Sequence, residues 1–291
     1  MELLRSLIFV PGNRPNMLER ARTFNADIIM VDLEDSVPGG EKTNARRLAA
    51  EWVPELQRQG KRVMVRVNSL DTGLTRDELA VVIGPNLYGV SIGKVASARD
   101  LTEVDRIIMP LEAAAGLAPG QVKLIPWIEN ARAVMMAYQI AVATPRIVAV
   151  AFGAEDYTND MGVQRTDHGE EAYFPRAMVA LAARAGKVAS LDTPFVSFRD
   201  PEGLRREARQ ARQLGYAGKF AIHPSQIEII NDTFSPLPED VAYARQVVDA
   251  WNQAEAAGRG SVDLNGRMID VPVVKRVHSL LALAEAIELG A

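Results

Sequence analysis

The fold is decided by residues 124–162, which read LIPWIENARAVMMAYQIAVATPRIVAVAFGAEDYTNDMG. Two apolar runs in this stretch, LIPWI and RIVAVAF, are typical of strands, and the segment between them, ARAVMMAYQIAVA, is predicted to be a helix. Glu129 follows the first run, and Glu155 and Asp156 follow the second. In a parallel α/β sheet, ligands bind at the carboxyl ends of the strands. The stretch therefore predicts a strand–helix–strand unit with carboxylates at its ligand-binding edge.

The same alternation continues on both sides of this unit. Eight short apolar runs are separated by amphipathic segments: SLIFV (6–10), DIIMVDL (27–33), RVMVRV (62–67), YGVSIGKV (88–95), VKLIPWI (122–128), RIVAVAF (146–152), VASLDTPF (188–195) and KFAIH (219–223). Near-continuous apolar strands indicate a parallel sheet that is covered on its faces. Eight strand–helix units predict a (β/α)₈ barrel, the TIM-barrel fold, as the catalytic domain over residues 1–235.

The pattern changes over residues 236–291. This tail reads as two helices with a hairpin signal at Asn265-Gly266 between them. It has no place in the barrel count, so we expect a C-terminal helical arm. Such an arm caps either its own barrel or the active site of a neighbouring subunit.

The amino-acid composition of the chain excludes several classes of function. The chain has 291 residues, a net charge of −4, and no long basic block, so nucleic acid is not an expected partner. It has no cysteine, which excludes disulfides, thiolate catalysis and Cys-ligated zinc. No apolar stretch reaches membrane-spanning length, and the first residues lack the features of a signal peptide. We therefore expect a cytoplasmic protein with no membrane partner.

Several familiar catalytic motifs are absent from the sequence. There is no HExxH zinc helix, no GxSxG elbow, no GxxxxGK[ST] loop and no GxGxxG fingerprint. Of the three histidines, His223 ends the eighth candidate strand, whereas His168 and His278 are placed in or near loops. A structural, hydrogen-bonding role is favoured for His223 over metal binding.

Glu129 and Asp156 are the candidate metal ligands. They end two sequential strands, which are adjacent in a barrel, and Mg²⁺ commonly binds through one or two carboxylates with water and substrate. The predicted cofactor is therefore Mg²⁺, with Mn²⁺ as an alternative ion. The competing interpretation is that one or both acids cap the helix that follows. Glu155 is expected to point away as a solvated or salt-bridged residue.

Arg66 is the candidate anchor for a substrate carboxylate. It lies near the end of an apolar strand, where an unpaired charge is costly, and its planar fork can grip a carboxylate at two points. The alternative is a structural ion pair with Asp32 or Glu34 on the neighbouring strand, and both roles can coexist. Asp32, Glu34 and Asp35 are expected to support Arg66 or metal-bound water rather than to bind the metal.

Arg14 follows the first strand and opens the first helix, where an arginine can bind a phosphate. A plain surface role is equally compatible with this position. Lys42 and Arg46 on the next helix are expected to be solvated.

Seven motifs, in order over nearly the whole chain, resemble those of the citrate lyase beta-subunit-like family within the HpcH/HpaI aldolase/citrate lyase superfamily. They are RSLIFVPGNRPNMLERA, DIIMVDLEDSV followed by EKTNAR, VRVN, PWIENARA, FGAEDYTNDMG, GKFAIHPSQI and RMIDVP. The family includes malyl-CoA and citramalyl-CoA lyases. The resemblance implies a Mg²⁺-dependent carbon–carbon lyase that cleaves or condenses a 3-hydroxyacyl-CoA into acetyl-CoA and a 2-oxo acid. It also implies a homotrimer or a dimer of trimers.

The resemblance also assigns residue roles. Glu129 and Asp156 match the metal ligands, and Glu129 is expected to contact the substrate as well. Arg66 matches the substrate-carboxylate arginine, and Arg14 matches the CoA-binding region. Asp270, in RMIDVP, matches an arm residue that transfers a proton in the neighbouring subunit's site, and this role rests wholly on the resemblance.

Three alternatives stay open. They are an aldolase acting on free 2-oxo acids without CoA, a citrate lyase beta-type subunit acting on an acyl-carrier-bound substrate, and a malyl-CoA thioesterase. The long C-terminal arm is expected to be missing from carrier-dependent relatives, which would favour a CoA enzyme. The chain also departs from the family pattern: relatives commonly carry an acid two residues after the lysine that matches Lys94, where this chain has Ala96.

Overall fold

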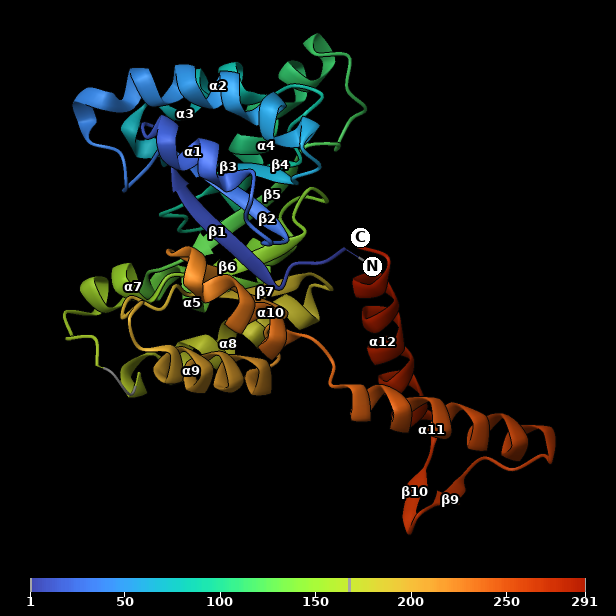
Figure 1. Ribbon diagram of the computed structural model, residues 1–291. Coiled ribbons are helices and arrows are strands. Elements are labelled where there is room, and N and C mark those ends of the chain that lie inside the picture. Colours follow the sequence, from blue (N-terminus) through green and yellow to red (C-terminus); the bar gives the residue numbers. More distant parts are fainter. Residues whose placement is uncertain (1, 167–168, 291) are drawn as a thin grey trace. The chain divides into compact units, whose positions relative to one another are not determined.

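The computed structural model describes residues 2–166 and 169–290. The chain divides into two compact units, one over Leu4–Thr233 and one that combines Met1–Leu3 with Phe234–Ala291. In the larger unit, eight parallel strands form a closed barrel in sequence order, and β8 pairs with β1 (Figure 1). The strands are β1 Ser6–Pro11, β2 Ile28–Asp32, β3 Val63–Val67, β4 Gly89–Ile92, β5 Lys123–Ile128, β6 Ala149–Phe152, β7 Ala189–Asp192 and β8 Gly218–Ala221. The (β/α)₈ prediction and all eight predicted strands are confirmed.

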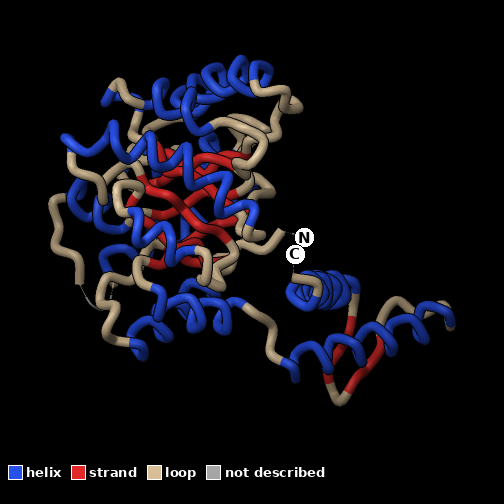
Figure 2. The backbone as a smooth tube through the Cα atoms, turned by 45° about the horizontal axis from the view of Figure 1, so that its top comes forward, coloured by secondary structure: helices blue, strands red, loops and turns tan. Residues whose placement is uncertain are grey.

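Helices surround this barrel and enclose its strands (Figure 2). They are α1 Pro15–Ala21, α2 Lys42–Arg58, α3 Thr75–Val82, α4 Ala98–Ala114, α5 Ala131–Met135, α6 Ala137–Ala141, α7 Ala154–Met161, α8 Glu170–Ala185, α9 Pro201–Leu214 and α10 Ile227–Phe234. Short 3₁₀ turns occupy Gly39–Glu41, Leu70–Thr72 and Pro224–Gln226. The described ranges contain no helix of the length and apolarity that a membrane span requires.

Two helix predictions near the deciding stretch were wrong. The segment ARAVMMAYQIAVA forms two short helices, α5 and α6, rather than one. The break is at Met136, whose N–H is shared between the carbonyls of Arg132 and Ala133 in a tightened last turn. The second difference is α7, which begins at Ala154, directly after β6, where no helix was predicted.

Strand alternation builds the barrel core. Successive side chains of a strand point to opposite faces, so every second residue enters the barrel. The fully interior set includes Leu7, Met30, Met64, Ile125, Trp127, Leu191 and Phe220. Three aromatic rings pack at the upper end of this core: Phe220 lies 4.4 Å from Trp127 and 5.2 Å from Phe9, between ring centroids. They form an apolar floor beneath the carboxyl ends of the strands.

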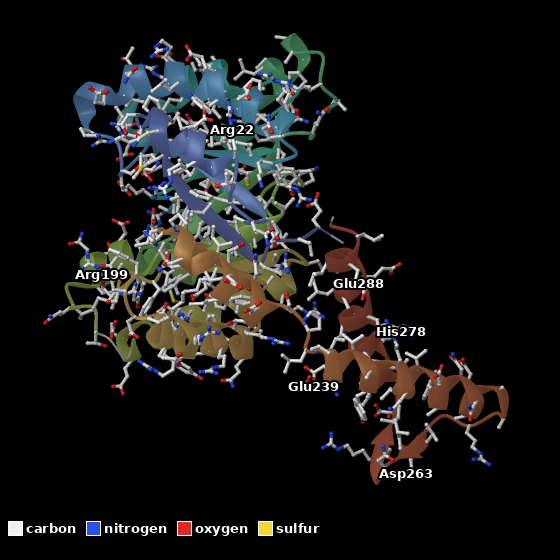
Figure 3. The ribbon with its side chains drawn as sticks, viewed as in Figure 1. Arg22, Arg199, Glu239, Asp263, His278 and Glu288 are labelled. Atoms are coloured by element: carbon white, nitrogen blue, oxygen red, sulfur yellow. The ribbon has the colours of Figure 1, made fainter. Side chains whose placement is uncertain are left out.

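The smaller unit contains α11 Pro238–Ala256, the hairpin β9 Val262–Leu264 and β10 Arg267–Ile269, and α12 Val271–Glu288. Asn265 and Gly266 both have positive φ angles, of 55° and 75°, as the predicted two-residue hairpin turn requires. The side chains of Ala244, Val247, Ile269, Val274 and Val277 form its own apolar core. Glu239, Asp263, His278 and Glu288 mark its elements in Figure 3. His278 therefore lies within α12 and not in a loop, and His168 lies outside the described residues.

Candidate active site

The site is built by the top layer of the barrel interior. The alternation that places Met64 in the core places Arg66 above it, and the alternation that buries Ile125 and Trp127 places Glu129 above them. Asp32 ends β2 directly opposite Arg66 in the register of the two strands. The sequence-predicted residues Arg66 and Glu129 thus lie at the same end of the barrel, on β3 and directly after β5, with β4 between these two strands.

The Glu129 carboxylate is packed between two glycines, Gly93 and Gly153. A Cβ atom at Gly93 would lie 2.9 Å from its Oε1, and one at Gly153 would lie 2.6 Å from its Oε2, so neither position has room for a side chain. The backbone N–H of Lys94 donates a hydrogen bond to Oε1. Burial raises the pKa of Glu129 to about 8, and the carboxylates of Asp156 and Glu34 add to the rise.

Arg66 is held by a two-point ion pair with Asp32. Its Nε and NH2 donate to the two carboxylate oxygens over 2.7 Å each, and its Cζ lies 4.5 Å from the centroid of the Phe9 ring. Its NH1 lies 3.2 Å from Glu34 Oε2 and 3.4 Å from Asp35 Oδ2. The structural ion pair is therefore present, and the NH1 side of the fork faces the buried Glu34 and the exposed Asp35.

Asp32 is fully occupied by its partners. Besides Arg66, it accepts hydrogen bonds from the backbone N–H groups of Glu34 and Ser36. Burial alone would raise the pKa of Asp32, but the Arg66 guanidinium outweighs burial and holds it below its usual range. As expected, Asp32 supports Arg66.

Glu34 bridges two cations. Its Oε1 contacts Lys94 Nζ at 3.2 Å, and its Oε2 contacts Arg66 NH1 at the same distance. A Cβ atom at Gly93 would lie 3.0 Å from Glu34 Oε1, so the carboxylates of Glu34 and Glu129 both lie against this glycine. Burial raises the pKa of Glu34, with Asp35 adding to the effect.

Asp156 lies in the first turn of α7, not at the strand end as predicted. The start of this helix is fixed by Ala154, whose N–H donates to Thr193 Oγ1 over 3.1 Å. Burial and the nearby Asp35 raise the pKa of Asp156, and Lys94 and Arg66 counteract the rise. Its carboxylate accepts no hydrogen bond from the residues that the structure describes. Glu155 instead pairs with Arg165 at 3.2 Å and is largely exposed, as expected.

Three further predicted residues, Arg14, Asp270 and His223, have contacts of their own. Arg14 is an exposed residue at the N-cap of α1, and its side chain does not cap the helix. Asp270 belongs to the smaller unit and is the N-cap of α12, where its Oδ1 accepts from Val273 N over 3.3 Å. The roles of both residues stay predictions. His223 contacts Ser225 Oγ through Nδ1 at 2.8 Å, which agrees with a structural role.

The donor set fits a hard divalent cation. Glu129 Oε2 and the Asp156 carboxylate are oxygen donors with no hydrogen-bond partner within residues 2–166 and 169–290. These same ranges hold no cluster of three or more His, Cys, Asp or Glu side chains that could bind a metal by themselves. Mg²⁺ commonly uses only one or two protein carboxylates and completes its octahedron with water and substrate. The residues present are therefore compatible with a Mg²⁺ site that is open to substrate.

Two lysines were missed by the sequence analysis. Lys42 was expected to be solvated, but its Nζ donates to Leu33 O and Glu34 O over 2.7 Å and to Asn68 Oδ1 over 2.8 Å. It therefore ties the loop after β2 to the end of β3. Lys94 was noted only as part of a family motif. The glycine before Lys94, at the end of an apolar strand, was the available signal for a close approach of the backbone.

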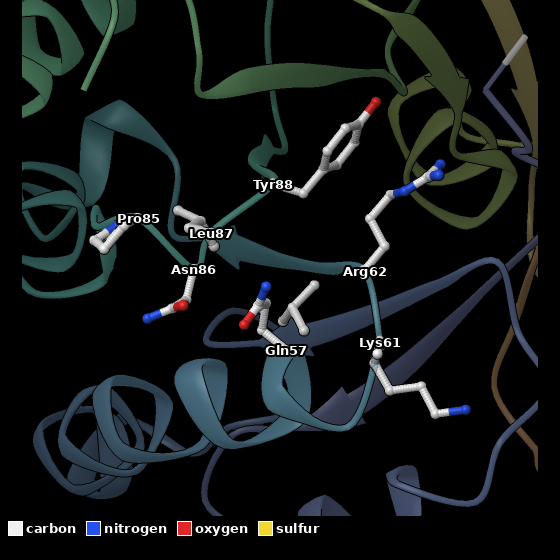
Figure 4. A pocket seen from close by; sticks show the side chains of 9 residues that line it. Gln57, Lys61, Arg62, Pro85, Asn86, Leu87 and Tyr88 are labelled. Atoms are coloured by element: carbon white, nitrogen blue, oxygen red, sulfur yellow. The ribbon is translucent and has the colours of Figure 1, made fainter. Parts of the chain in front are cut away.

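A pocket of about 300 Å³ lies at the opposite end of the barrel, where β3 and β4 begin (Figure 4). Lys61 Nζ donates to Phe24 O over 2.7 Å, and Arg62 Cζ lies 5.2 Å from the Tyr88 ring centroid. The amino-terminal face of such barrels serves stability. None of the candidate catalytic residues lines this pocket.

Comparison with known proteins agrees with this geometry. The family model described as HpcH/HpaI aldolase/citrate lyase matches residues 5–224. The citrate lyase subunit beta of Leuconostoc mesenteroides is 36% identical, with 98% of this chain and 94% of that protein covered. The L-malyl-CoA/beta-methylmalyl-CoA lyase of Cereibacter sphaeroides is 34% identical, with coverages of 97% and 95%.

A solved structure of a citrate lyase-type protein is also similar to this chain. CitE from Mycobacterium tuberculosis, in complex with magnesium, acetoacetate and coenzyme A, superimposes with a TM-score of 0.77 at 30% identity. The superposition covers 97% of this chain and 100% of that chain. The match to the citrate lyase subunit also corrects one expectation. Because it covers 98% of this chain, a long C-terminal arm does not separate CoA lyases from citrate lyase beta subunits. The barrel, its carboxylate site and these matches agree, and the chain belongs to the HpcH/HpaI aldolase/citrate lyase family.

Proposed function

We propose that this protein is a Mg²⁺-dependent carbon–carbon lyase that cleaves, or in reverse condenses, a 3-hydroxyacyl-CoA such as malyl-CoA or citramalyl-CoA. The observation that carries the proposal is the position of Arg66 beside Glu129 at one barrel end, with Asp156 electrostatically coupled to Glu129. An arginine fork and oxygen donors together suit a 2-hydroxy carboxylate. The relatives named as lyases of citrate and of malyl-CoA support the same reaction class.

Glu129 and Asp156 would hold the metal, which would acidify the substrate hydroxyl and polarise the forming keto oxygen. Arg66 would bind the substrate carboxylate through its NH1 side, because Asp32 occupies the Nε hydrogen and one of the two NH2 hydrogens. As a general base takes the hydroxyl proton, the bond between the hydroxyl-bearing carbon and the carbon next to the thioester breaks. A 2-oxo acid leaves, and the electron pair of the broken bond stays on the carbon next to the thioester, as an enolate whose charge is shared with the carbonyl oxygen.

The enolate then takes a proton to give acetyl-CoA. We assign this proton transfer to Asp270 of a neighbouring subunit, in a homotrimer or a dimer of trimers. Arg14, exposed at the start of α1, would bind a phosphate of the CoA moiety. In the isolated chain Asp270 caps α12 by accepting a hydrogen bond from Val273 N–H. The proposed role therefore requires that Asp270 give up this hydrogen bond and contact the substrate.

A second candidate substrate has an observation in its favour. Citrate lyase beta subunits match this chain over nearly its full length, so a substrate carried by an acyl-carrier protein fits the same site. Purified protein would be given malyl-CoA, citramalyl-CoA, free 2-oxo acids with an aldol acceptor, and citryl-carrier protein. We expect a CoA ester to release a 2-oxo acid together with acetyl-CoA. Turnover of only the carrier-bound or only the free substrates would contradict the proposal, and release of free CoA without condensation would indicate a thioesterase.

A further inference from the structure

The proposed metal site contains more carboxylates than a Mg²⁺ ion needs. Asp32, Glu34, Asp35, Glu129 and Asp156 all lie close enough to share charge interactions with Arg66. Asp32 is committed to Arg66 by a two-point contact. Glu34 and Glu129, in contrast, lie against the same glycine, Gly93, and both present carboxylate oxygens there. Some contact must therefore determine which of these carboxylates binds the ion.

From these contacts we infer that Lys94 is the positioning residue that selects the metal ligands, an inference that rests on the proposed metal site. Its ammonium holds Glu34 and Asp35 away from the ion, while its backbone N–H holds Glu129 in place. The backbone N–H contacts Glu129, and the side-chain ammonium contacts Glu34 and Asp35, so the two functions use different parts of Lys94. Apart from Lys94, Arg66 is the only cation that contacts the Glu34 carboxylate within the described ranges.

The backbone function depends on an unusual conformation. Lys94 has a φ angle of 55°, in the left-handed region that a non-glycine residue adopts only at a cost. In this conformation its N–H donates to Glu129 Oε1. That bond occupies one oxygen of Glu129 and leaves Oε2, next to Gly153, as the oxygen without a hydrogen bond. Glycine would adopt the same φ without strain, so the backbone contact does not itself require the lysine side chain.

The side-chain function follows from two ion pairs. Lys94 Nζ lies 3.2 Å from Glu34 Oε1 and 3.3 Å from Asp35 Oδ1. Glu34 is buried, and its other oxygen contacts Arg66 NH1, so its carboxylate is held from both ends by cations. Removing the ammonium would free Oε1 of Glu34, which lies 3.0 Å from a Cβ position at Gly93, where Glu129 Oε1 lies at 2.9 Å. A divalent ion would then gain Glu34 as an extra ligand.

The loop around Lys94 borders a pocket of about 230 Å³. Its lining combines Gly93, Lys94 and Val95 with apolar side chains and two acids: Leu70, Asp71, Ile92, Asp100, Leu101 and Val104. Ala96, where relatives commonly carry an acid, gives its N–H to Asp100 in the capping box of α4. The acids that pair with Lys94 thus come from the loop after β2 and not from its own loop.

The test measures Mn²⁺ binding directly, from the electron paramagnetic resonance signal of the free ion, without substrate. Lys94→Gly keeps the N–H and the positive φ but removes the ammonium. We expect it to bind Mn²⁺ about tenfold more tightly or more, because a cation is removed and a carboxylate is freed. Lys94→Arg retains a cation and should stay within about threefold of the parent protein. Lys187→Gly is the matched control, since Lys187 also has a positive φ, of 60°, but lies exposed between α8 and β7.

A double-mutant cycle separates ligand selection from simple charge removal. If Lys94 acts by restraining Glu34, Lys94→Gly should tighten Mn²⁺ binding much less when Glu34 is already Gln. Unchanged Mn²⁺ affinity in Lys94→Gly, or an equal effect in both backgrounds, would overturn the inference. Lys94→Met provides a second variant without the ammonium if the glycine variant does not fold. Absence of Mn²⁺ binding in the parent protein, or binding that survives Asp156→Ala, would instead count against the proposed metal site itself.

Discussion

Asp32 and Arg66 form a two-point ion pair across neighbouring strands, with Nε to Oδ1 and NH2 to Oδ2 both at 2.7 Å. The two residues are directly opposite in the register of β2 and β3, and the Asp32 side chain is only 1% exposed. The contact fixes the plane of the guanidinium above the Phe9 ring. It therefore sets the direction from which a substrate carboxylate can approach Arg66.

Replacing Asp32 with Asn tests this arrangement. The variant leaves the buried Arg66 without its main counter-charge, so the free energy of unfolding should fall by about 3 kcal/mol. The fork also loses its fixed orientation, and we expect kcat/KM to fall by about tenfold to a hundredfold. Asp35→Asn is the matched control, because that side chain is 52% exposed and its contact with Arg66 should contribute less than about 1 kcal/mol. Equal effects of the two substitutions, measured by denaturant unfolding and steady-state kinetics, would contradict this account.

Gly153 should tolerate no side chain. A Cβ at this position would lie 2.6 Å from Glu129 Oε2, so Gly153→Ala must displace the carboxylate. We expect Mn²⁺ affinity to fall by about tenfold to a hundredfold, measured by the free-ion resonance signal. Gly84→Ala is the control, since nothing lies within 4 Å of a Cβ there and its φ is not positive. Unaltered Mn²⁺ binding in Gly153→Ala would show that the position of the Glu129 carboxylate beside Gly153 does not matter for metal binding.

Lys42 should stabilise the loop after β2 far more than its position at a helix start suggests. Lys42→Met removes the donor to two backbone carbonyls and to Asn68 Oδ1. We expect the free energy of unfolding to fall by about 2 kcal/mol, because these acceptors lose a charged partner. Arg46→Met, one turn later, removes a 3.3 Å contact with the exposed Asp77 and should cost less than about 1 kcal/mol. Chemical denaturation of both variants measures the difference, and a loss in Arg46→Met as large as that in Lys42→Met would refute it.

A buried ion cluster behind β7 and β8 predicts a pH-dependent contribution to stability. Asp192 accepts from Arg176 and Lys219 with no exposure to solvent. Burial opposes ionisation, but Lys219 and Arg176 outweigh it and hold the pKa of Asp192 below its ordinary value of 3.8. A depressed folded-state pKa gives stability that is fully present above the unfolded pKa and is lost as the pH falls through the folded pKa.

Asp192→Asn should therefore lower the free energy of unfolding by about 3–5 kcal/mol at pH 7, because the buried Arg176 loses its carboxylate partner and the buried Lys219 keeps only Glu207. The gap between the parent protein and this variant should narrow as the pH falls below about 4. Urea unfolding at several pH values measures this gap. A gap that stays constant down to pH 2 would show that folding does not lower the pKa of Asp192.

The barrel could be predicted from the sequence because each strand is a short apolar run and its period is unambiguous. Arg66 and Glu129 could be placed at strand ends for the same reason. Asp156 was misplaced because an acid four residues after an apolar run fits both a strand end and the first turn of a helix. The backbone conformation of Lys94 could not be predicted from its residue type, because a lysine rarely adopts a positive φ, and only the preceding Gly93 gave a signal there.

Cleavage of malyl-CoA by the purified protein tests the central claim most directly. The assay would follow release of glyoxylate and acetyl-CoA with Mg²⁺, with a chelator, and in the variants Asp156→Asn and Glu155→Gln. We expect turnover that stops on chelation, that is lost in Asp156→Asn, and that persists in Glu155→Gln, whose side chain is exposed and paired with Arg165. Turnover that survives chelation, or equal activity in the two variants, would contradict the assignment of this site as a metal-dependent lyase centre.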